Sequence, residues 1–190
     1  MMIYILDNFD SFTYNLVHYI TAEGAQVLVE RNDEIDFSNI ELCDKIVLSP
    51  GPGLPVNAGG MMELIQKYVG VKPIFGVCLG HQAIAEHFGW RLRNLNEVFH
   101  GVDCTVSVDS SHYLFNGVPT RFRAGRYHSW VVDNASGIDL DVTAVDEEGD
   151  IMALAHSYLD ICGVQFHPES VMTEFGRDII KNWLNEKGSQ

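Results

Sequence analysis

The sequence predicts an α/β protein with an open, mostly parallel sheet, flanking helices and additional antiparallel strands. From residue 2 to residue 88, short apolar runs alternate with segments whose apolar residues recur at helical spacing. This alternation is typical of a parallel sheet covered on both faces. From about residue 91 to residue 155, strand-like segments follow one another without clear helices, which indicates antiparallel strands. The 190 residues contain no repeat and no convincing linker, so we expect residues 1–190 to form a single domain.

Each element is predicted from its apolar pattern and its boundary residues. An apolar run predicts a first strand over 2–6, and Asp10 or Ser11 can cap a following helix over 11–23 that Gly24 ends. Further apolar runs predict strands over 25–30, 45–49, 73–77 and 160–166. Helical spacing predicts helices from 59 or 60 to 68, over 81–88 and over 175–184. In the antiparallel region the clearest strands are 104–108 and 130–132.

The composition restricts the class of partner. The formal net charge is −14, which argues against nucleic acid and anionic membranes, because both attract positive charge. No stretch is long and apolar enough to cross a membrane, and the first residues do not resemble a signal peptide. The four cysteines are scattered without CxxC or zinc-like spacing. We therefore expect a cytoplasmic protein with reduced thiols and no metal site.

Cys78 lies where a predicted strand turns into a predicted helix. The segment Gly76-Val77-Cys78-Leu79-Gly80 has the form G-x-nucleophile-x-G, in which flanking glycines leave room for a strained turn. A sulfur at a helix N-terminus is favoured as the thiolate, the form that attacks carbonyl carbons. The alternative is a small buried hydrophobic residue, the usual role of a cysteine in a reduced protein.

His167 and Glu169 are the best partners for such a nucleophile. Pro168 favours an extended conformation at His167, so the two side chains can point to the same side. A carboxylate that orients an imidazole gives the base and orienting group of a catalytic triad. An ordinary loop histidine beside an ordinary glutamate is the alternative. The other histidines, including His81, His128 and His156, are expected to have capping, core or surface roles.

The segment Leu48-Ser49-Pro50-Gly51-Pro52-Gly53 follows the third predicted strand. Its prolines stiffen the loop and its glycines allow close approach and supply N–H donors. The N–H groups of Gly53 and Leu79 are therefore candidates for an oxyanion hole in an acyl transfer. A rigid turn without a ligand is the alternative, and the segment fits neither GxxxxGK nor GxGxxG.

Five segments together resemble the class I glutamine amidotransferase domain, in the form of the small subunits of anthranilate synthase and aminodeoxychorismate synthase. They are LDNFDSFTYNLV at 6–17, LSPGPG at 48–53, GVCLGHQAI at 76–84, RYHS at 126–129 and GVQFHPES at 163–170. The resemblance covers nearly the whole chain. It implies that Cys78 is the nucleophile and that His167 and Glu169 complete the triad.

The resemblance also implies a binding site for glutamine. Gly51, Pro52 and Gly53 match the loop that borders the substrate, with Gly53 and Leu79 as oxyanion donors. The remaining matches are Gln82, whose side chain contacts glutamine, and Ser129 and Trp130, whose backbone holds its amino-acid end. The family usually has leucine at position 130 and HGK where this chain has His100-Gly101-Val102.

The implied activity is hydrolysis of glutamine through a thioester on Cys78. No cofactor or metal is implied for this chain, and magnesium is expected only in the partner. That partner is a chorismate-using large subunit, component I of anthranilate synthase or of aminodeoxychorismate synthase, which receives the ammonia. We favour the anthranilate branch of tryptophan biosynthesis; the folate branch, or service to both, is the alternative.

Three other functions are weighed against this one. The first is a glutaminase for a different partner, such as a guanylate or carbamoyl-phosphate synthetase. The second is a free-standing hydrolase of γ-glutamyl compounds, which would be fully active alone. The third is a non-catalytic module that binds glutamine, which would have no chemical need for Cys78, His167 and Glu169.

Overall fold

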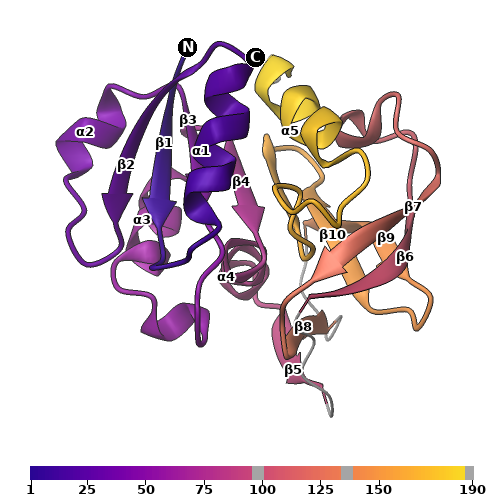
Figure 1. Ribbon diagram of the computed structural model, residues 1–190. Coiled ribbons are helices and arrows are strands. Elements are labelled where there is room, and N and C mark those ends of the chain that lie inside the picture. Colours follow the sequence, from indigo (N-terminus) through magenta and orange to yellow (C-terminus); the bar gives the residue numbers. More distant parts are fainter. Residues whose placement is uncertain (96–100, 134–138, 187–190) are drawn as a thin grey trace.

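The protein is described by a computed structural model of residues 1–95, 101–133 and 139–186. Within these residues one large sheet has the strand order β2-β1-β3-β4-β11-β10-β9-β6-β7 (Figure 1). Its parallel part contains β1 (Met2–Asp7), β2 (Gln26–Arg31), β3 (Lys45–Leu48), β4 (Ile74–Val77) and β11 (Ile161–Val164). The predicted parallel sheet is confirmed.

The remaining strands of the large sheet are antiparallel. They are β10 (Ile151–His156), β9 (Leu140–Asp146), β6 (Val102–Val108) and β7 (Arg121–Arg126). A separate ribbon pairs β5 (Arg91–Asn94) with β8 (Trp130–Asp133). The antiparallel strands expected between residues 91 and 155 are therefore confirmed, and they lie beside the parallel part in Figure 1.

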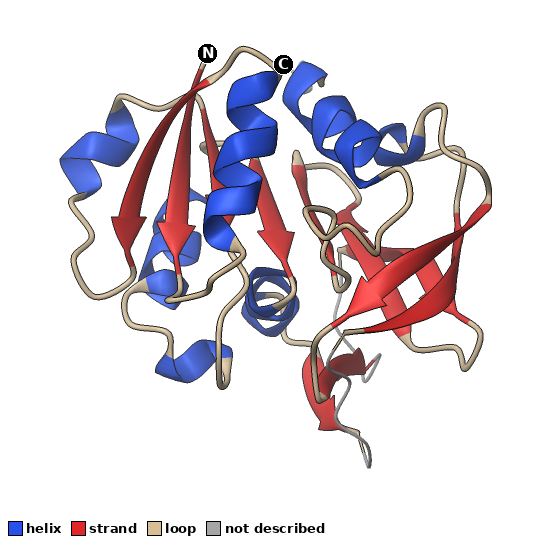
Figure 2. Cartoon of the chain, in the orientation of Figure 1, coloured by secondary structure: helices blue, strands red, loops and turns tan. Residues whose placement is uncertain are grey.

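Helices cover both faces of the parallel part (Figure 2). On one face lie α1 (Thr13–Ala22) and α5 (Gly176–Asn185), and on the other α2 (Phe37–Glu41), α3 (Met61–Tyr68) and α4 (Leu79–His87). The short 3-10 helices are η1 (Pro55–Asn57) and η2 (Tyr113–Phe115). Since both faces of the sheet are covered, every residue of its central strands β3, β4 and β11 is buried. None of the helices in the described part of the chain is long and apolar enough to span a membrane.

Several boundaries differ from those predicted. Helix α1 begins at Thr13, because the Asp10 side chain accepts the N–H of Phe12 and so stabilises a turn ahead of the helix, without capping it. The predicted end is confirmed, since Gly24 has a φ of 89°. Helix α2 was not predicted; it is a short helix of 5 residues, with Asp36 accepting the N–H of Ser38 as its cap.

A buried lysine joins the parallel sheet to the last helix. Lys45, at the start of β3, donates from Nζ to the carbonyl oxygens of Trp183 at 2.7 Å and Glu186 at 2.8 Å. These carbonyls belong to the end of α5, where helical acceptors lack partners and a positive charge is favourable. Lys45 therefore fixes the C-terminal end of α5 against the start of β3.

Candidate active site

The turn at Cys78 has the strained geometry that the sequence predicts. Strand β4 ends at Val77 and helix α4 begins at Leu79, and Cys78 between them has a φ of 52° and a ψ of −99°. A Cβ at Gly76 would collide with backbone atoms of Gly80, and a Cβ at Gly80 would collide with the carbonyl oxygen of Leu48. Both glycines are therefore needed, because no side chain fits between the elements that meet at this turn.

Sheet order brings His167 and Glu169 to Cys78. Strands β4 and β11 are parallel neighbours, with Val77 paired to Val164, so the residues that follow each strand meet at the same edge. His167 and Glu169 are both buried, and His167 Nδ1 lies 2.7 Å from Glu169 Oε1. The structure thus brings together the three residues that the sequence suggested as a triad.

The electrostatics of this group favour a charged imidazole. Burial lowers the pKa of His167, but Cys78 and Glu169 outweigh it and hold that pKa well above its ordinary value. Phe12 lies edge-on to the imidazole with ring centroids 5.3 Å apart, and the centroid of the Tyr127 ring lies 4.8 Å from that of the imidazole. An imidazolium beside a thiol, screened from water by aromatic rings, is a suitable environment for a cysteine nucleophile.

The glycine-proline loop after β3 is fixed by an asparagine that the sequence analysis did not single out. The Asn8 side chain donates to the Ser49 carbonyl at 2.9 Å, and its backbone N–H donates to the Ser49 hydroxyl at 2.9 Å. A Cβ at Gly51 would lie 2.5 Å from the Asn8 Cβ, and Gly53 has a φ of 79°. Asn8 is thus a reason why the loop keeps one conformation beside Cys78.

A pocket of about 130 Å³ gathers most of the predicted site residues. It is lined by Gly51, Pro52, Gly53, Cys78, Gln82, Ser129 and Trp130, together with Tyr127 and His128. Leu79, His167 and Glu169 are buried and do not line it; Leu79 is the first residue of α4, where backbone N–H groups lack helical acceptors. A pocket of this size suits a small molecule rather than a polymer.

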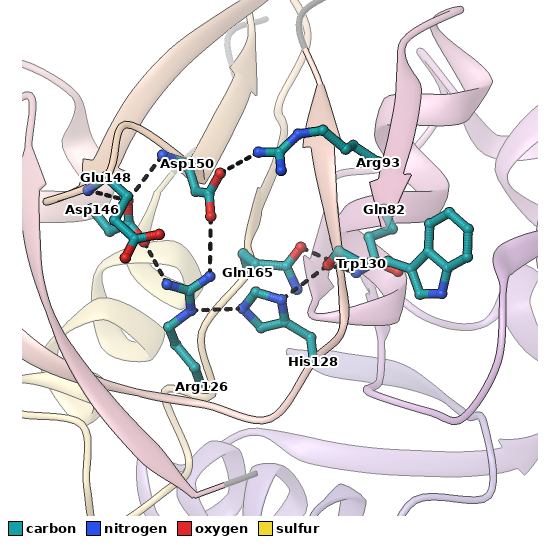
Figure 3. Close-up of polar contacts among 9 residues, drawn as sticks. All are labelled: Gln82, Arg93, Arg126, His128, Trp130, Asp146, Glu148, Asp150 and Gln165. Carbon is teal, nitrogen blue, oxygen red and sulfur yellow. Dashed lines mark hydrogen bonds and ion pairs between the residues drawn. The ribbon is translucent and has the colours of Figure 1, made fainter. Parts of the chain in front are cut away.

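His128 has a more specific place than the role expected from sequence. Its Nδ1 lies 2.9 Å from the Trp130 carbonyl oxygen, which also accepts from Gln82 Nε2 at 2.9 Å (Figure 3). Burial, and then the charge of Arg126, lower the pKa of His128 to about 3, so it is neutral at ordinary pH. The other two histidines follow expectation: His81 is in the core with a pKa lowered by burial to about 3, and His156 Nδ1 accepts the backbone N–H groups of residues 158 and 159.

The two departures from the family pattern have different structural settings. Val102 begins β6 opposite Arg126 and is 45% exposed, while His100 lies outside the described residues. The Trp130 indole points away from the hydrogen-bonded groups around its own carbonyl (Figure 3). The contacts of that carbonyl are therefore independent of the side chain at position 130.

Sequence comparison identifies relatives along the whole chain. Residues 4–187 match the family described as glutamine amidotransferase class-I. The chain is 46% identical to anthranilate synthase component 2 of Lactococcus lactis, with 97% of this chain and 94% of the relative covered. It is 44% identical to the aminodeoxychorismate/anthranilate synthase component 2 of Bacillus subtilis, covering 96% of this chain and 95% of that one.

Solved structures share the fold. A protein of Thermoplasma acidophilum assigned to GMP synthase has a TM-score of 0.86 and 29% identity, covering 97% of this chain and 92% of that one. A glutamine amidotransferase of Thermotoga maritima has a TM-score of 0.77 at 16% identity, covering 97% of this chain and 80% of that one. Since the family match extends over almost every residue and the curated relatives align nearly end to end, this chain belongs to the class I glutamine amidotransferase family.

Proposed function

We propose that this chain is the glutaminase subunit of an enzyme that aminates chorismate. One observation carries the proposal: Cys78 lies on a strained turn in the wall of a small pocket, with the His167–Glu169 pair buried beside it. A thiol held at a helix N-terminus beside a charged imidazole is equipped to attack an amide carbon.

In the first half of the reaction the Cys78 thiolate attacks the side-chain amide carbon of glutamine. A carbon–sulfur bond forms and the carbonyl oxygen becomes an oxyanion. His167, charged beforehand, gives its proton to the amide nitrogen, the carbon–nitrogen bond breaks, and ammonia leaves a glutamyl thioester. In the second half neutral His167 takes a proton from water, the resulting hydroxide attacks the thioester, and glutamate and the thiolate are released.

Two backbone N–H groups are proposed to hold the oxyanion. Leu79 supplies one from the first turn of α4, and Gly53 supplies the other from the loop that Asn8 fixes. Donors placed before the reaction cost no reorganisation when charge develops, and each is typically worth about 3 kcal/mol. The positive φ of Gly53 permits this placement, because other residues rarely adopt it.

The other pocket residues are proposed to bind the amino-acid end of glutamine. Ser129 and Trp130 present backbone groups opposite the loop formed by Gly51 and Pro52, and Gln82 contacts the substrate from α4. No metal or other cofactor is needed for these steps. Magnesium belongs, in this proposal, to the partner that uses chorismate.

The partner is proposed from the relatives. The curated proteins that align with this chain end to end include component 2 of anthranilate synthase and component 2 of aminodeoxychorismate synthase, the latter from Klebsiella aerogenes at 44% identity. The Bacillus subtilis relative carries both names. We favour anthranilate synthase component I as the partner; the alternative is component I of aminodeoxychorismate synthase, or both. Identity to the protein assigned to GMP synthase is lower, at 29%.

The decisive experiment measures glutamate release from glutamine by the purified chain, alone and with each candidate large subunit. Cys78→Ala is the blank. Weak activity alone that rises with one large subunit supports the proposal and identifies the pathway. Full activity without any partner would favour a free-standing hydrolase, and an absence of activity in every mixture would refute the enzymatic function.

A further inference from the structure

Gln165 is a buried polar residue beside the nucleophile that the proposed mechanism leaves without a role. The pairing of Val77 with Val164 places Gln165 next to Cys78, and the Cys78 N–H donates to the Val164 carbonyl at 2.9 Å. Val164 and Phe166 pack in the core beneath α1 and α5, so Gln165 between them faces the opposite side, where α4 lies. Its side-chain Nε2 is 3.5 Å from Cys78 Sγ.

The orientation of the Gln165 amide follows from its neighbours. The Trp130 carbonyl oxygen can only accept, so the Gln82 atom 2.9 Å from it must be Nε2. The same Gln82 Nε2 lies 3.1 Å from Gln165, which must therefore present its oxygen, Oε1. The Gln165 NH2 group is consequently the end directed at the Cys78 sulfur.

The donor and acceptor roles are also determined at the other end of this series of hydrogen bonds, around Arg126 and His128 (Figure 3). Arg126 can only donate, so His128 Nε2, 3.2 Å from Arg126 Nε, must accept, and His128 Nδ1 carries the proton that is donated to the Trp130 carbonyl. Asp146 and Asp150 hold the Arg126 guanidinium at 2.6 and 3.2 Å. Arg93 reaches Asp150 from β5.

We propose that Gln165 is a further catalytic residue, which donates an N–H to the Cys78 sulfur and stabilises it as the thiolate before attack and after thioester hydrolysis. Gln82 and His128 are positioning residues for that donor, and Arg126 fixes the tautomer of His128. This inference rests on the proposed function in taking Cys78 as the nucleophile. It assigns a direction to each hydrogen bond from the arginine to the sulfur.

The test is the pH dependence of alkylation of Cys78 by iodoacetamide, measured without glutamine. Among the described residues, the titratable groups around the thiol are His167 and Glu169 from the segment after β11, His81 on α4, and Tyr127 and His128, which line the pocket with Cys78. These groups are unchanged in the variants, so a shift in the midpoint reports on the amide.

The other thiols are poor competitors in this assay. Burial raises the pKa of Cys104 to about 11 and that of Cys162 to about 12, and it also raises the pKa of Cys43. Cys78→Ala gives the background rate from these three.

Three variants are compared with the wild-type chain. Gln165→Met removes the donor at similar length and is expected to raise the midpoint of alkylation by about one pH unit, a tenfold change in the thiolate equilibrium. Gln82→Met leaves Gln165 in place but removes its orienting partner, and a smaller shift in the same direction is expected. Gln66→Met, at an exposed glutamine of α3, is the matched control and should leave the midpoint unchanged.

A midpoint in Gln165→Met equal to that of Gln66→Met would overturn the role of Gln165. If Gln165→Met does not fold, Gln82→Met decides, and an unshifted midpoint there would overturn the proposal. A shifted midpoint in a chain that hydrolyses no glutamine would support the contact and refute the proposed function, so the two failures are distinguishable.

Discussion

Removing the charge of Glu169 is the sharpest test of the proposed triad. Glu169→Gln keeps the length of the side chain and an oxygen for the hydrogen bond to His167 Nδ1, which measures 2.7 Å in the wild-type chain. The Oε2 atom of Glu169 makes no hydrogen bond to any of the described residues, so the new NH2 group displaces none. The substitution therefore removes the negative charge that faces the imidazolium, and it places a buried NH2 group where the described residues offer no acceptor.

The expected effect can be worked from this geometry. Two unit charges about 4 Å apart at an effective dielectric constant of about 20 interact by about 4 kcal/mol, and a hydrogen bond to a charged group contributes about 1.5–3 kcal/mol net. A loss of about 2–4 kcal/mol corresponds to a fall in kcat of about 30- to 1,000-fold. The KM for glutamine should change much less, because Glu169 does not line the pocket.

The assay is glutamate release under saturating glutamine, with the activating large subunit present. Glu148→Gln, which neutralises an exposed carboxylate, controls for the change in net charge. A titration of the His167 ring by NMR should show that its pKa falls in Glu169→Gln, since Glu169 is one of the groups that raise it. A variant that folds normally and retains more than a tenth of wild-type kcat would refute this reasoning.

Three further predictions concern stability and substrate binding. Burial lowers the pKa of both His81 and His128 from 6.5 to about 3. As pH falls below 6.5, these imidazoles gain protons in the unfolded chain but stay neutral in the folded chain, so the free energy of unfolding falls. His128→Asn should therefore flatten the decline of unfolding free energy between pH 6 and pH 4 by about 1.4 kcal/mol per unit, and equal slopes in denaturant titrations would contradict this. Lys45→Met should lower the free energy of unfolding by about 1–3 kcal/mol through loss of two hydrogen bonds at the end of α5, and an unchanged denaturant midpoint would count against that role. Trp130→Leu should leave the KM for glutamine within about threefold, because the substitution keeps the hydrogen bonds from Gln82 and His128 to the carbonyl of residue 130, each worth about 1 kcal/mol. A tenfold rise in KM would show that the indole binds substrate.

Much of the parallel half could be predicted from local pattern. Strong apolar runs between turn residues locate β1, β3 and β4, and the glycines around Cys78 signal the strained turn that the structure has. The coming together of Cys78 with His167 also follows, because parallel strands end at one edge of the sheet. Helix α2 was missed, since five residues are too few to show a helical period.

The contributions of Asn8, His128 and Gln165 could not be predicted in the same way. Asn8 acts through Ser49 and Gln165 through Gln82, partners that are distant in the sequence. The partners of His128, Arg126 and Trp130, are only two residues away, but no local pattern shows that the three side chains and backbone groups meet. A buried amide or imidazole has the same appearance in the sequence as an exposed one. The strand order places Asn8 beside the loop after β3, and the register of β4 against β11 places Gln165 beside Cys78.

The aromatic residues between positions 9 and 14 illustrate the same limit. Phe9 is 50% exposed, and Tyr14, in the first turn of α1, is 65% exposed. Phe12 instead packs against the rings of Tyr127 and His167. An apolar ring in the sequence therefore does not by itself indicate whether the side chain is exposed, as in Phe9 and Tyr14, or packed beside a triad residue, as in Phe12.

The hydrogen bond from Cys78 to Val164 has a consequence for the order in which the chain folds. The thiol and its neighbour Gln165 are 87 residues apart in the sequence, so β11 reaches β4 only after a long loop has closed. Contacts between residues so far apart in the sequence tend to form late in folding, because closing the long loop between them costs conformational entropy. During synthesis, the segment around Cys78 therefore emerges well before the strand that completes its environment. The cysteine gains Gln165, His167 and Glu169 as neighbours only after residues 161–169 have been made and β11 has paired with β4.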